Sequence, residues 1–472
     1  MSGEDEIMNC RMLHRSRALL PMAICLAGFS GAVSASGFAL IEQSVSGLGN
    51  AFAGGAAATD DASVQFFNPA ALTELSGTQV SLAGHFIMPS AKLVNASASV
   101  VTLGNIPVTG TVDDAGVSAL VPNFYYARDL NSQLKFGLGI NAPFGLATEY
   151  DKTWIGRYHA IKSEVQTVDI NPALAYKLSD QLSLGIGVNA EYIKAELSSA
   201  VDSGSICYAL VTQAGGLLGD IATTCNAAGL TPGNPSADSA AKIEGDDWSY
   251  GINIGLLYQP SNATRIGVAY RDAIKQAIRG HATFTRSAAF NALLNVAAPT
   301  LFTPTTDAAD IELPASAAVS IAQQLNPQLE LLADITWTQW SALQELRVTY
   351  GNVAQPATVT TENWDDTLRY AIGLSYKLDD RIKLRTGLAY DQSPVPDVTH
   401  RTPRIPDNDR TWLALGMSYA SNEHLSYDVA YAHLFVHDTA IDNTTEGSIR
   451  HNLQGTYQVG IDILSAQLNY RF

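Results

Sequence analysis

The chain has 472 residues, of which 46% are hydrophobic and 15% charged, and its formal net charge is −17. A strongly acidic balance argues against nucleic acid and other polyanionic partners. The one continuous apolar stretch, residues 18–29, is too short to cross a bilayer as a helix. Residence in a membrane would therefore require a closed sheet.

Residues 1–35 have the features of a secretory signal peptide. Basic residues precede the apolar stretch, and the small residues Val33-Ser34-Ala35 follow it as a cleavage site. The basic residues are Arg11, Arg15 and Arg17. We therefore expect export of the chain and cleavage after Ala35.

The next segment, residues 36–76, is rich in glycine and alanine and lacks any alternation of apolar and polar residues. It contains Phe38 near its start, a Gly47-Leu48-Gly49 run, and Asn68-Pro69-Ala70 near its end. An alternating pattern begins only after this segment. The mature chain is therefore predicted to have two parts, residues 36–76 and a sheet over residues 77–472.

Apolar and polar residues alternate over segments of about ten residues, the length that a transmembrane β-strand needs. In Ser183–Tyr192 every even-numbered residue is apolar, and in Arg381–Asp391 most residues of the opposite face are charged. A soluble β-sandwich has the same period. The export signal and the aromatic residues at segment ends favour an all-β, transmembrane antiparallel β-barrel instead; these aromatic residues are Tyr192, Tyr258, Tyr270 and Tyr390.

Two connections are long, near residues 198–242 and 280–308, whereas others are short. Long loops on one side and short turns on the other are typical of the extracellular and periplasmic ends of an outer-membrane barrel. Cys207 and Cys225 lie in the first long loop. An even pair of cysteines in an exported chain predicts a disulfide, and the alternative of a metal pair lacks a nearby histidine.

Apolar residues in these two loops are unusual unless they pack together or meet an apolar ligand. Two interpretations stand from the sequence, namely short helices packed on the barrel rim or a groove that captures ligand. The leucines concerned are Leu210, Leu217, Leu218, Leu293 and Leu294.

The C-terminal residues 466–472 alternate up to Phe472, with Tyr470 two residues earlier. Bacterial outer-membrane barrels finish their last strand in this way. Such strands often carry a glycine five residues before the end, where this chain has Gln467. We interpret the difference as a variation.

Several motifs resemble those of the FadL/TodX family of outer-membrane transporters for hydrophobic compounds. They cover nearly the whole mature chain and are Gly47-Leu48-Gly49, Asp60-Asp61-Ala62, Asn68-Pro69-Ala70, Val121-Pro122-Asn123, Phe144-Gly145-Leu146, Asp391-Gln392-Ser393-Pro394 and Ile405-Pro406-Asp407-Asn408-Asp409-Arg410. The resemblance implies a barrel of about fourteen strands with the N-terminal segment folded into the lumen as a plug, or hatch. It also implies a lateral route, by which ligand leaves through the barrel wall into the membrane.

Pro143, Phe144 and Gly145 interrupt the strand that runs from Lys135. Proline cannot donate a ladder hydrogen bond and glycine favours bulges. Our hypothesis is that these three residues form the lateral opening. An ordinary strand end near a turn is the alternative.

The resemblance also assigns residues to the hatch and the lumen. Phe38 matches the residue whose segment reaches the interior ligand pocket, and Asn68, Pro69 and Ala70 belong to the hatch. Other matches are expected to form structural ion pairs where barrel and hatch meet, and these are Asp391, Asp409 and Arg410.

Family members that take up fatty acids hold the carboxylate with basic residues. At the two corresponding positions this chain has Ser199 and Thr360. Three basic residues could substitute, although each is expected rather as a salt-bridge partner in the lumen; they are Lys194, Arg271 and Arg369.

The predicted function is passive uptake of hydrophobic molecules, first of all long-chain fatty acids, with monoaromatic hydrocarbons as the alternative. The expected partners are this ligand, the lipids and lipopolysaccharide of the outer membrane, and the barrel-assembly machinery. No cofactor or metal is expected, and an enzyme is disfavoured because no Gly-x-Ser-x-Gly motif occurs. A general porin or an adhesive barrel is a weaker alternative, because the N-terminal segment would obstruct an open pore.

Overall fold

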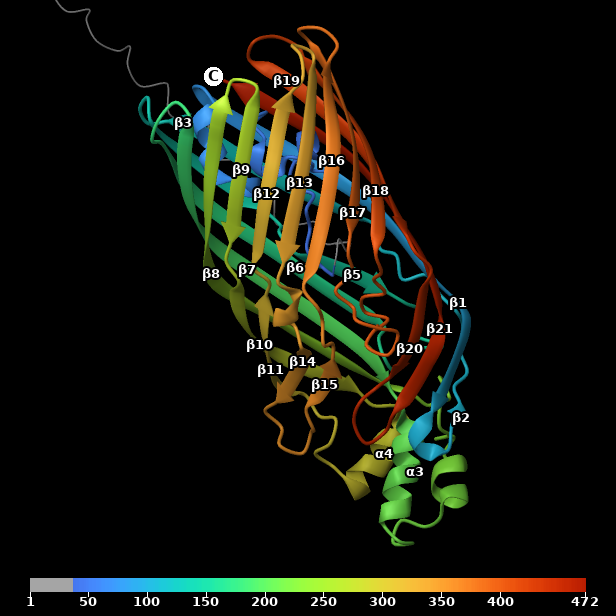
Figure 1. The fold of residues 1–472 in the computed structure, drawn as a ribbon. Helices are drawn as coiled ribbons and strands as arrows, with labels where there is room; N and C mark the ends of the chain where they lie inside the picture. Colours follow the sequence, from blue (N-terminus) through green and yellow to red (C-terminus); the bar gives the residue numbers. More distant parts are fainter. Residues whose placement is uncertain (1–36) are drawn as a thin grey trace, which may run out of the picture.

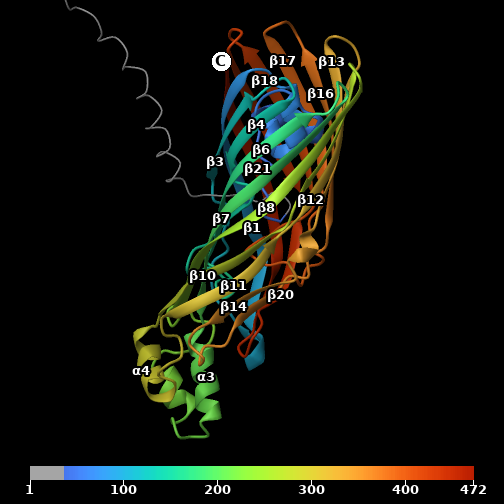
Figure 2. The same cartoon turned by 90° about the vertical axis from the view of Figure 1, so that its left-hand side faces the viewer.

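The computed structural model describes residues 37–472, and the expected signal peptide of residues 1–35 lies outside them. One antiparallel sheet closes on itself to form a tall barrel (Figures 1 and 2). The first strand, β1 (Thr78–Val100), pairs with the last, β21 (His451–Arg471), from Gln79↔Arg471 to Val100↔His451. Because the two terminal strands pair, the barrel wall has no free edge at its seam.

The wall has 14 strands, and seven of them are interrupted and therefore carry two labels each. In chain order the segments after β1 are β2 (Ile106–Pro107), β3 (Ala119–Asp129), β4 (Leu134–Asn141), β5 (Gly145–Glu149), β6 (Lys162–Lys177), β7 (Leu182–Val201), β8 (Ser239–Ser261), β9 (Thr264–Arg271), β10 (Ile274–Thr285), β11 (Thr305–Leu313), β12 (Ser316–Gln324), β13 (Leu329–Thr338), β14 (Glu345–Tyr350), β15 (Thr358–Thr361), β16 (Thr367–Lys377), β17 (Ile382–Asp391), β18 (Arg410–Ala420), β19 (Leu425–Val436), β20 (Thr439–Thr444) and β21.

The wall is apolar outside and polar inside, the reverse of a soluble protein. On β17, Leu384 and Leu388 are 40% and 51% exposed, whereas Arg385 and Asp391 are 6% and 4% exposed. Outward apolar side chains suit lipid, and inward polar ones suit a lumen. The prediction of an all-β transmembrane barrel is therefore confirmed. No helix within residues 37–472 is long and apolar enough to cross a membrane.

The two ends of the barrel differ. Turns at the end that carries the C-terminus are short, and the loop helices α3 (Ser203–Gln213), η4 (Ile221–Asn226) and α4 (Ala288–Ala297) lie at the opposite end (Figure 1). The two long connections, from β7 to β8 and from β10 to β11, cover residues 202–238 and 286–304. They are shorter than the spans expected from the sequence because backbone pairing continues beyond the lipid-facing alternation, for example between Lys242 and Ser198.

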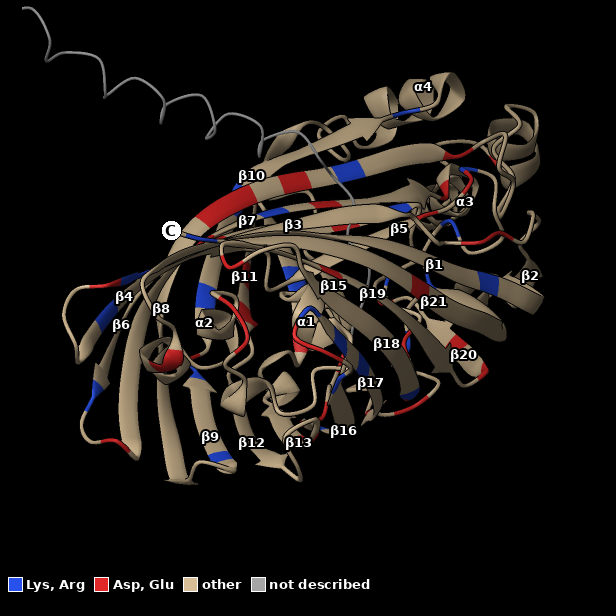
Figure 3. Ribbon diagram, turned by 90° about the horizontal axis from the view of Figure 1, so that it is seen from above, with Lys and Arg blue, Asp and Glu red and all other residues tan. Residues whose placement is uncertain are grey.

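The N-terminal segment lies inside the ring of strands (Figure 3). It forms α1 (Val45–Leu48), η1 (Gly55–Ala57), α2 (Val64–Phe67) and η2 (Pro69–Glu74). Leu48 and Phe52 pack with inward residues of the wall, among them Trp412. The amide of Val45 donates a hydrogen bond of 3.0 Å to Oε1 of Gln467, so the residue that replaces the usual glycine of the last strand contacts this segment directly.

Inward-facing glycines allow the backbone of the segment to touch the wall. A Cβ built on Gly387 would lie 2.1 Å from the carbonyl oxygen of Asn50, and one on Gly267 would lie 1.9 Å from that of Ala56. No side chain fits in that space. These glycines are therefore required by close approach of two backbones.

We predict that Gly387→Val displaces the N-terminal segment, because overpacking of this kind costs about 1–3 kcal/mol. Ion conductance of the purified protein in planar bilayers should rise relative to the natural protein. Gly460→Val on β21 is the matched control, because a Cβ there meets nothing within 4 Å. Equal conductance of Gly387→Val and the natural protein would contradict the prediction.

Candidate functional site

The lumen contains an apolar cavity on the loop side of Phe38. Strands β6, β7, β8, β10, β11 and β14 supply most of its wall. The apolar side chains are Phe38, Leu146, Val165, Ala195, Leu197, Ile243, Ile278, Ala308, Ala309, Ile311, Leu343, Leu346, Val348 and Ile405. Its charged lining residues are Asp307, Glu362 and Arg404. A space with this predominantly apolar lining suits an apolar ligand.

Phe38 forms the floor of this cavity. Its ring centroid lies 5.0 Å from that of Trp340, 5.9 Å from that of Phe144 and 6.1 Å from that of Trp364. Only 6% of Phe38 is exposed. The sequence-predicted pocket residue thus lies in an aromatic cluster built from the N-terminal segment and two different parts of the wall.

A second space, the inner cavity, lies on the other side of this cluster. Leu40, Ile41, Phe66, Phe67 and Pro69 of the N-terminal segment line it. Pro143 and Phe144 line it from the wall, and Arg271, Arg369 and Asp391 add polar groups. The backbone of residues 38–41 therefore separates the two cavities.

The ladder of the wall is interrupted between β4 and β5, at the residues that the sequence proposes as a lateral opening. The pairing of β3 with β4 ends at Phe124↔Ile140, and the next contact on that side is the bridge Gly116↔Thr148. No ladder pair is formed on the β3 side by residues 141–147, within the part of the chain that the structure describes. Pairing with β6 continues on the other side, at Gly145↔Gln166.

The broken strand pairs instead with the N-terminal segment. The amide of Leu40 donates to the carbonyl of Pro143, and the amide of Gly145 donates to the carbonyl of Phe38, both at 2.8 Å. The side chain of Thr167 accepts from the amide of Phe144 at 3.0 Å. Pro143 and Phe144 thus line the inner cavity, and hydrogen bonds to residues 38 and 40 hold Gly145 and Pro143.

Polar side chains of the wall fasten the N-terminal segment. Arg369, Asp391 and Arg410 lie opposite one another on β16, β17 and β18. Nη2 of Arg369 donates to the carbonyl of Ala51 at 2.6 Å, and Arg410 pairs with Asp407.

Two further carboxyl groups complete this polar region. Asp409 accepts hydrogen bonds from the hydroxyl of Tyr390 at 2.6 Å and from the amide of Ser393 at 2.8 Å. Burial raises the pKa of the Glu42 carboxyl to about 7, although Arg410 and Arg369 oppose the shift. Glu42 is therefore partly neutral near pH 7.

The Asn68-Pro69-Ala70 motif seats the segment on the wall. Nδ2 of Asn68 donates to the carbonyls of Ala56, at 2.6 Å, and Leu256, at 3.0 Å, while its Oδ1 accepts from the amide of Ala70. Of the three motif residues, Pro69 lines the inner cavity. Asn68 and Ala70 instead hold the fold of the segment.

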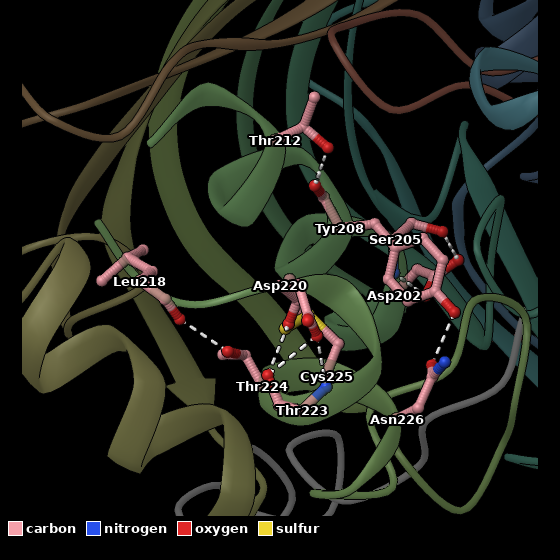
Figure 4. Close-up of a disulfide and its surroundings, with 11 residues drawn as sticks. Asp202, Ser205, Tyr208, Thr212, Leu218, Asp220, Thr223, Thr224, Cys225 and Asn226 are labelled. Carbon is pink, nitrogen blue, oxygen red and sulfur yellow. Dashed lines mark hydrogen bonds between the residues drawn. A yellow bond between two sulfur atoms is a disulfide. The ribbon is translucent and has the colours of Figure 1, made fainter. Parts of the chain in front are cut away.

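The loop helices form a separate apolar cluster stapled by the disulfide between Cys207 and Cys225 (Figure 4). Both cysteines are fully buried, and their Cα atoms are 5.9 Å apart. Asp202 accepts from the amide of Ser205 and so caps α3. Four of the five predicted capture leucines pack in this cluster, namely Leu210, Leu218, Leu293 and Leu294.

Leu217 differs from these four because 91% of its surface is exposed. The loop leucines therefore form a packed core with one projecting apolar residue.

The basic residues nominated from the sequence lie elsewhere than the apolar cavity. Lys194 lines a polar cavity at the rim, together with Arg279 and His281. Arg271 donates to Asn189 at 2.6 Å and lies 3.5 Å from Asp169.

Arg404 is the basic residue that does line the apolar cavity, and the sequence reasoning missed it. Its one available signal was its position directly before the Ile405-Pro406-Asp407 motif. Ser199 and Thr360 are not among the residues that line the cavity.

A barrel that is apolar outside, filled by its own N-terminal segment and hollowed by an apolar cavity belongs to the class of plugged outer-membrane transporters. Residues 26–472 match the family model described as outer membrane protein transport protein (OMPP1/FadL/TodX). The chain therefore belongs to this family, whose members are transport proteins of the outer membrane rather than enzymes.

Individual relatives match the sequence of this chain over most of its length. The long-chain fatty acid transport protein of Escherichia coli K12 is 31% identical over 418 residues, which cover 88% of this chain and 91% of that protein. Outer membrane protein P1 of Haemophilus influenzae strain Rd is 31% identical over 480 residues, covering 97% and 99%.

Solved structures share the fold. A Pseudomonas aeruginosa FadL homologue has a TM-score of 0.79 at 25% identity and covers 92% of this chain and 100% of its own. The Ralstonia pickettii toluene transporter TbuX has a TM-score of 0.60 at 20% identity, covering 90% and 99%.

We predict that the double substitution Cys207→Ser and Cys225→Ser loosens the loop cluster alone. Closure of a loop with a sequence separation of 18 contributes about 3 kcal/mol to stability. Limited proteolysis should cut residues 202–238 faster, while the barrel keeps its resistance to unfolding in SDS. An unchanged rate of cleavage would contradict the prediction.

Proposed function

We propose that this protein is a passive outer-membrane transporter that takes up hydrophobic molecules, above all long-chain fatty acids, and releases them sideways into the membrane. The observation that carries the proposal is the apolar cavity whose floor, Phe38, belongs to the same short segment that pairs with the wall break at Pro143–Gly145. A ligand that displaces Phe38 thereby disturbs the contacts that close the break.

Partitioning supplies the driving force for capture. Each CH₂ group moved from water into an apolar site gains about 0.8 kcal/mol, so a long acyl chain is extracted without any input of chemical energy. In our proposal the loop leucines, with exposed Leu217 at their edge, take the ligand first. The apolar cavity and then the inner cavity receive it in turn.

The N-terminal segment of residues 36–76 acts in this proposal as a hatch over a barrel of residues 77–472. A lumen of fourteen strands is wide enough to pass water and small solutes if it is not obstructed. The contacts of Asn68, Ala51 and Val45 with wall residues support this role. In this proposal the polar contacts around Asp391, Asp409 and Arg410 help to keep the hatch in place.

Fatty acids are favoured by the names of the relatives that are at least 30% identical, several of which are long-chain fatty acid transport proteins. Toluene transporters share the fold at lower identity. The outward apolar side chains imply contact with outer-membrane lipids and lipopolysaccharide. Insertion of a closed barrel implies the barrel-assembly machinery.

Uptake assays test the substrate. We predict that a strain lacking the protein loses growth on oleate and uptake of labelled oleate, and that the natural gene restores both. Toluene uptake should change little. Loss of toluene uptake alone would favour the monoaromatic alternative, whereas loss of neither would contradict the transporter. Liposomes containing the protein should not swell in small sugars, as a general porin would require.

The proposed lateral exit lies at the interruption between β4 and β5. Replacing Pro143 by Thr and Gly145 by Val should favour a regular ladder across the break, and oleate uptake should fall to near the level of the deletion strain. Pro172→Thr on β6 is the matched control and should keep uptake. Both variants must migrate as folded barrels in unheated SDS gels. Normal uptake by a folded double variant would rule out this exit.

A further inference from the structure

Few charged side chains line the apolar cavity. Its lining includes the acids Asp307 and Glu362 and the base Arg404. Burying a cation among apolar side chains is costly unless a partner compensates for the lost water. The groups that pair with Arg404 therefore determine which ligands this cavity can bind.

One nitrogen of the Arg404 guanidinium, Nη1, makes the hydrogen bonds of this side chain. Nη1 donates to Oγ of Ser163 at 2.9 Å and to the carbonyl of Lys162 at 3.3 Å. Its backbone carbonyl accepts from the hydroxyl of Thr148 at 3.2 Å. Three contacts from β5 and β6 thus fix the residue, and they do so without a carboxylate.

The guanidinium has no ion-pair partner at contact distance among residues 37–472. No Asp or Glu oxygen of this part of the chain lies within the 4.0 Å that defines an ion pair with Arg404. Nε and Nη2 also have no hydrogen-bond acceptor among these residues. Donors in this fork geometry match a carboxylate.

Among residues 37–472, neither acid of the cavity forms an ion pair with this base. Burial raises the pKa of the Glu362 carboxyl to about 8, against the opposing charge of Arg404, so Glu362 is mainly protonated at neutral pH. Burial lowers the pKa of Arg404 to about 10, which leaves the guanidinium charged. Asp307 also lines the rim cavity, where Lys194 and His281 lie.

We propose that Arg404 determines the specificity of the cavity by binding the carboxylate of a long-chain fatty acid whose alkyl chain occupies the apolar cavity. This inference rests on the proposed function and adds to it a reason for preferring an acid over a hydrocarbon. A neutral ligand of equal length would leave the charged guanidinium desolvated and unpaired.

The test compares oleate with oleyl alcohol, which has the same chain and no charge. Equilibrium binding of each labelled compound is measured at pH 7 for the purified, detergent-solubilised protein, for Arg404→Gln and for Arg404→Lys. Arg347→Gln is the control, since this arginine is exposed and its partner Glu345 lies on the same strand. We expect Arg404→Gln to lower the affinity for oleate at least about tenfold and to leave that for oleyl alcohol within about twofold.

Arg404→Lys should fall between the natural protein and Arg404→Gln, and Arg347→Gln should match the natural protein. Unchanged oleate affinity in Arg404→Gln would overturn the inference. Equal weakening of both ligands would overturn it too, because Arg404 would then only support the shape of the cavity. If the natural protein bound neither compound, the proposed function would fail together with the inference.

A spectroscopic measurement separates direct contact from an indirect effect. The ¹³C resonance of carboxyl-labelled oleate, bound to the natural protein, should keep its ionised position to a lower pH than in Arg404→Gln, because a guanidinium at contact distance favours the carboxylate. Titration of the bound carboxyl at the same pH in both proteins would contradict contact with Arg404.

Discussion

The width of the barrel is the constraint on which the rest of the structure depends. Fourteen strands enclose a lumen that inward side chains alone do not fill, whereas eight strands are closed by their own side chains. The chain meets this constraint with its own N-terminal residues. Inward-facing glycines such as Gly267 and Gly387 let the backbone of this segment contact the backbone of the wall. Asn68 and Arg369 donate hydrogen bonds to carbonyl groups of the segment. A filled lumen in turn leaves room for small apolar cavities in place of a water channel.

One stretch of extended backbone, residues 38–41, connects the features of the site. It contributes the floor of the apolar cavity through Phe38 and the roof of the inner cavity through Leu40. It also pairs with Pro143 and Gly145, where the wall is not closed by β3. These contacts are few and local, while the segment beyond residue 45 is fastened at many points. Movement of this short stretch would therefore open both cavities to each other and leave the remainder in place.

Much of the fold could be predicted because lipid imposes a simple rule on the wall. Alternation in segments such as Ser183–Tyr192, joined to an export signal, predicts outward apolar faces, and exposed Leu184 and Ile186 confirm them. Strand ends could not be predicted beyond the membrane, since Lys242 and Glu244 continue the ladder without an apolar face. Arg404 was missed for a related reason. Its position depends on how residues 392–409 fold back into the lumen, and no period in the sequence encodes that path. Leu217 and Leu294 are both leucines of apolar loop segments. Only the folded structure shows that Leu217 is exposed and Leu294 is buried.

The hydrogen bond between the amide of Val45 and Gln467 has a consequence for the order of assembly. Residues 45 and 467 lie almost at opposite ends of the chain, so this contact cannot form until the final strand has been synthesised and inserted. The seam of β1 and β21 closes in the same event. A barrel that is still open thus holds its N-terminal segment less firmly than a finished one. Closure of the seam and this contact of the N-terminal segment therefore both depend on the last strand.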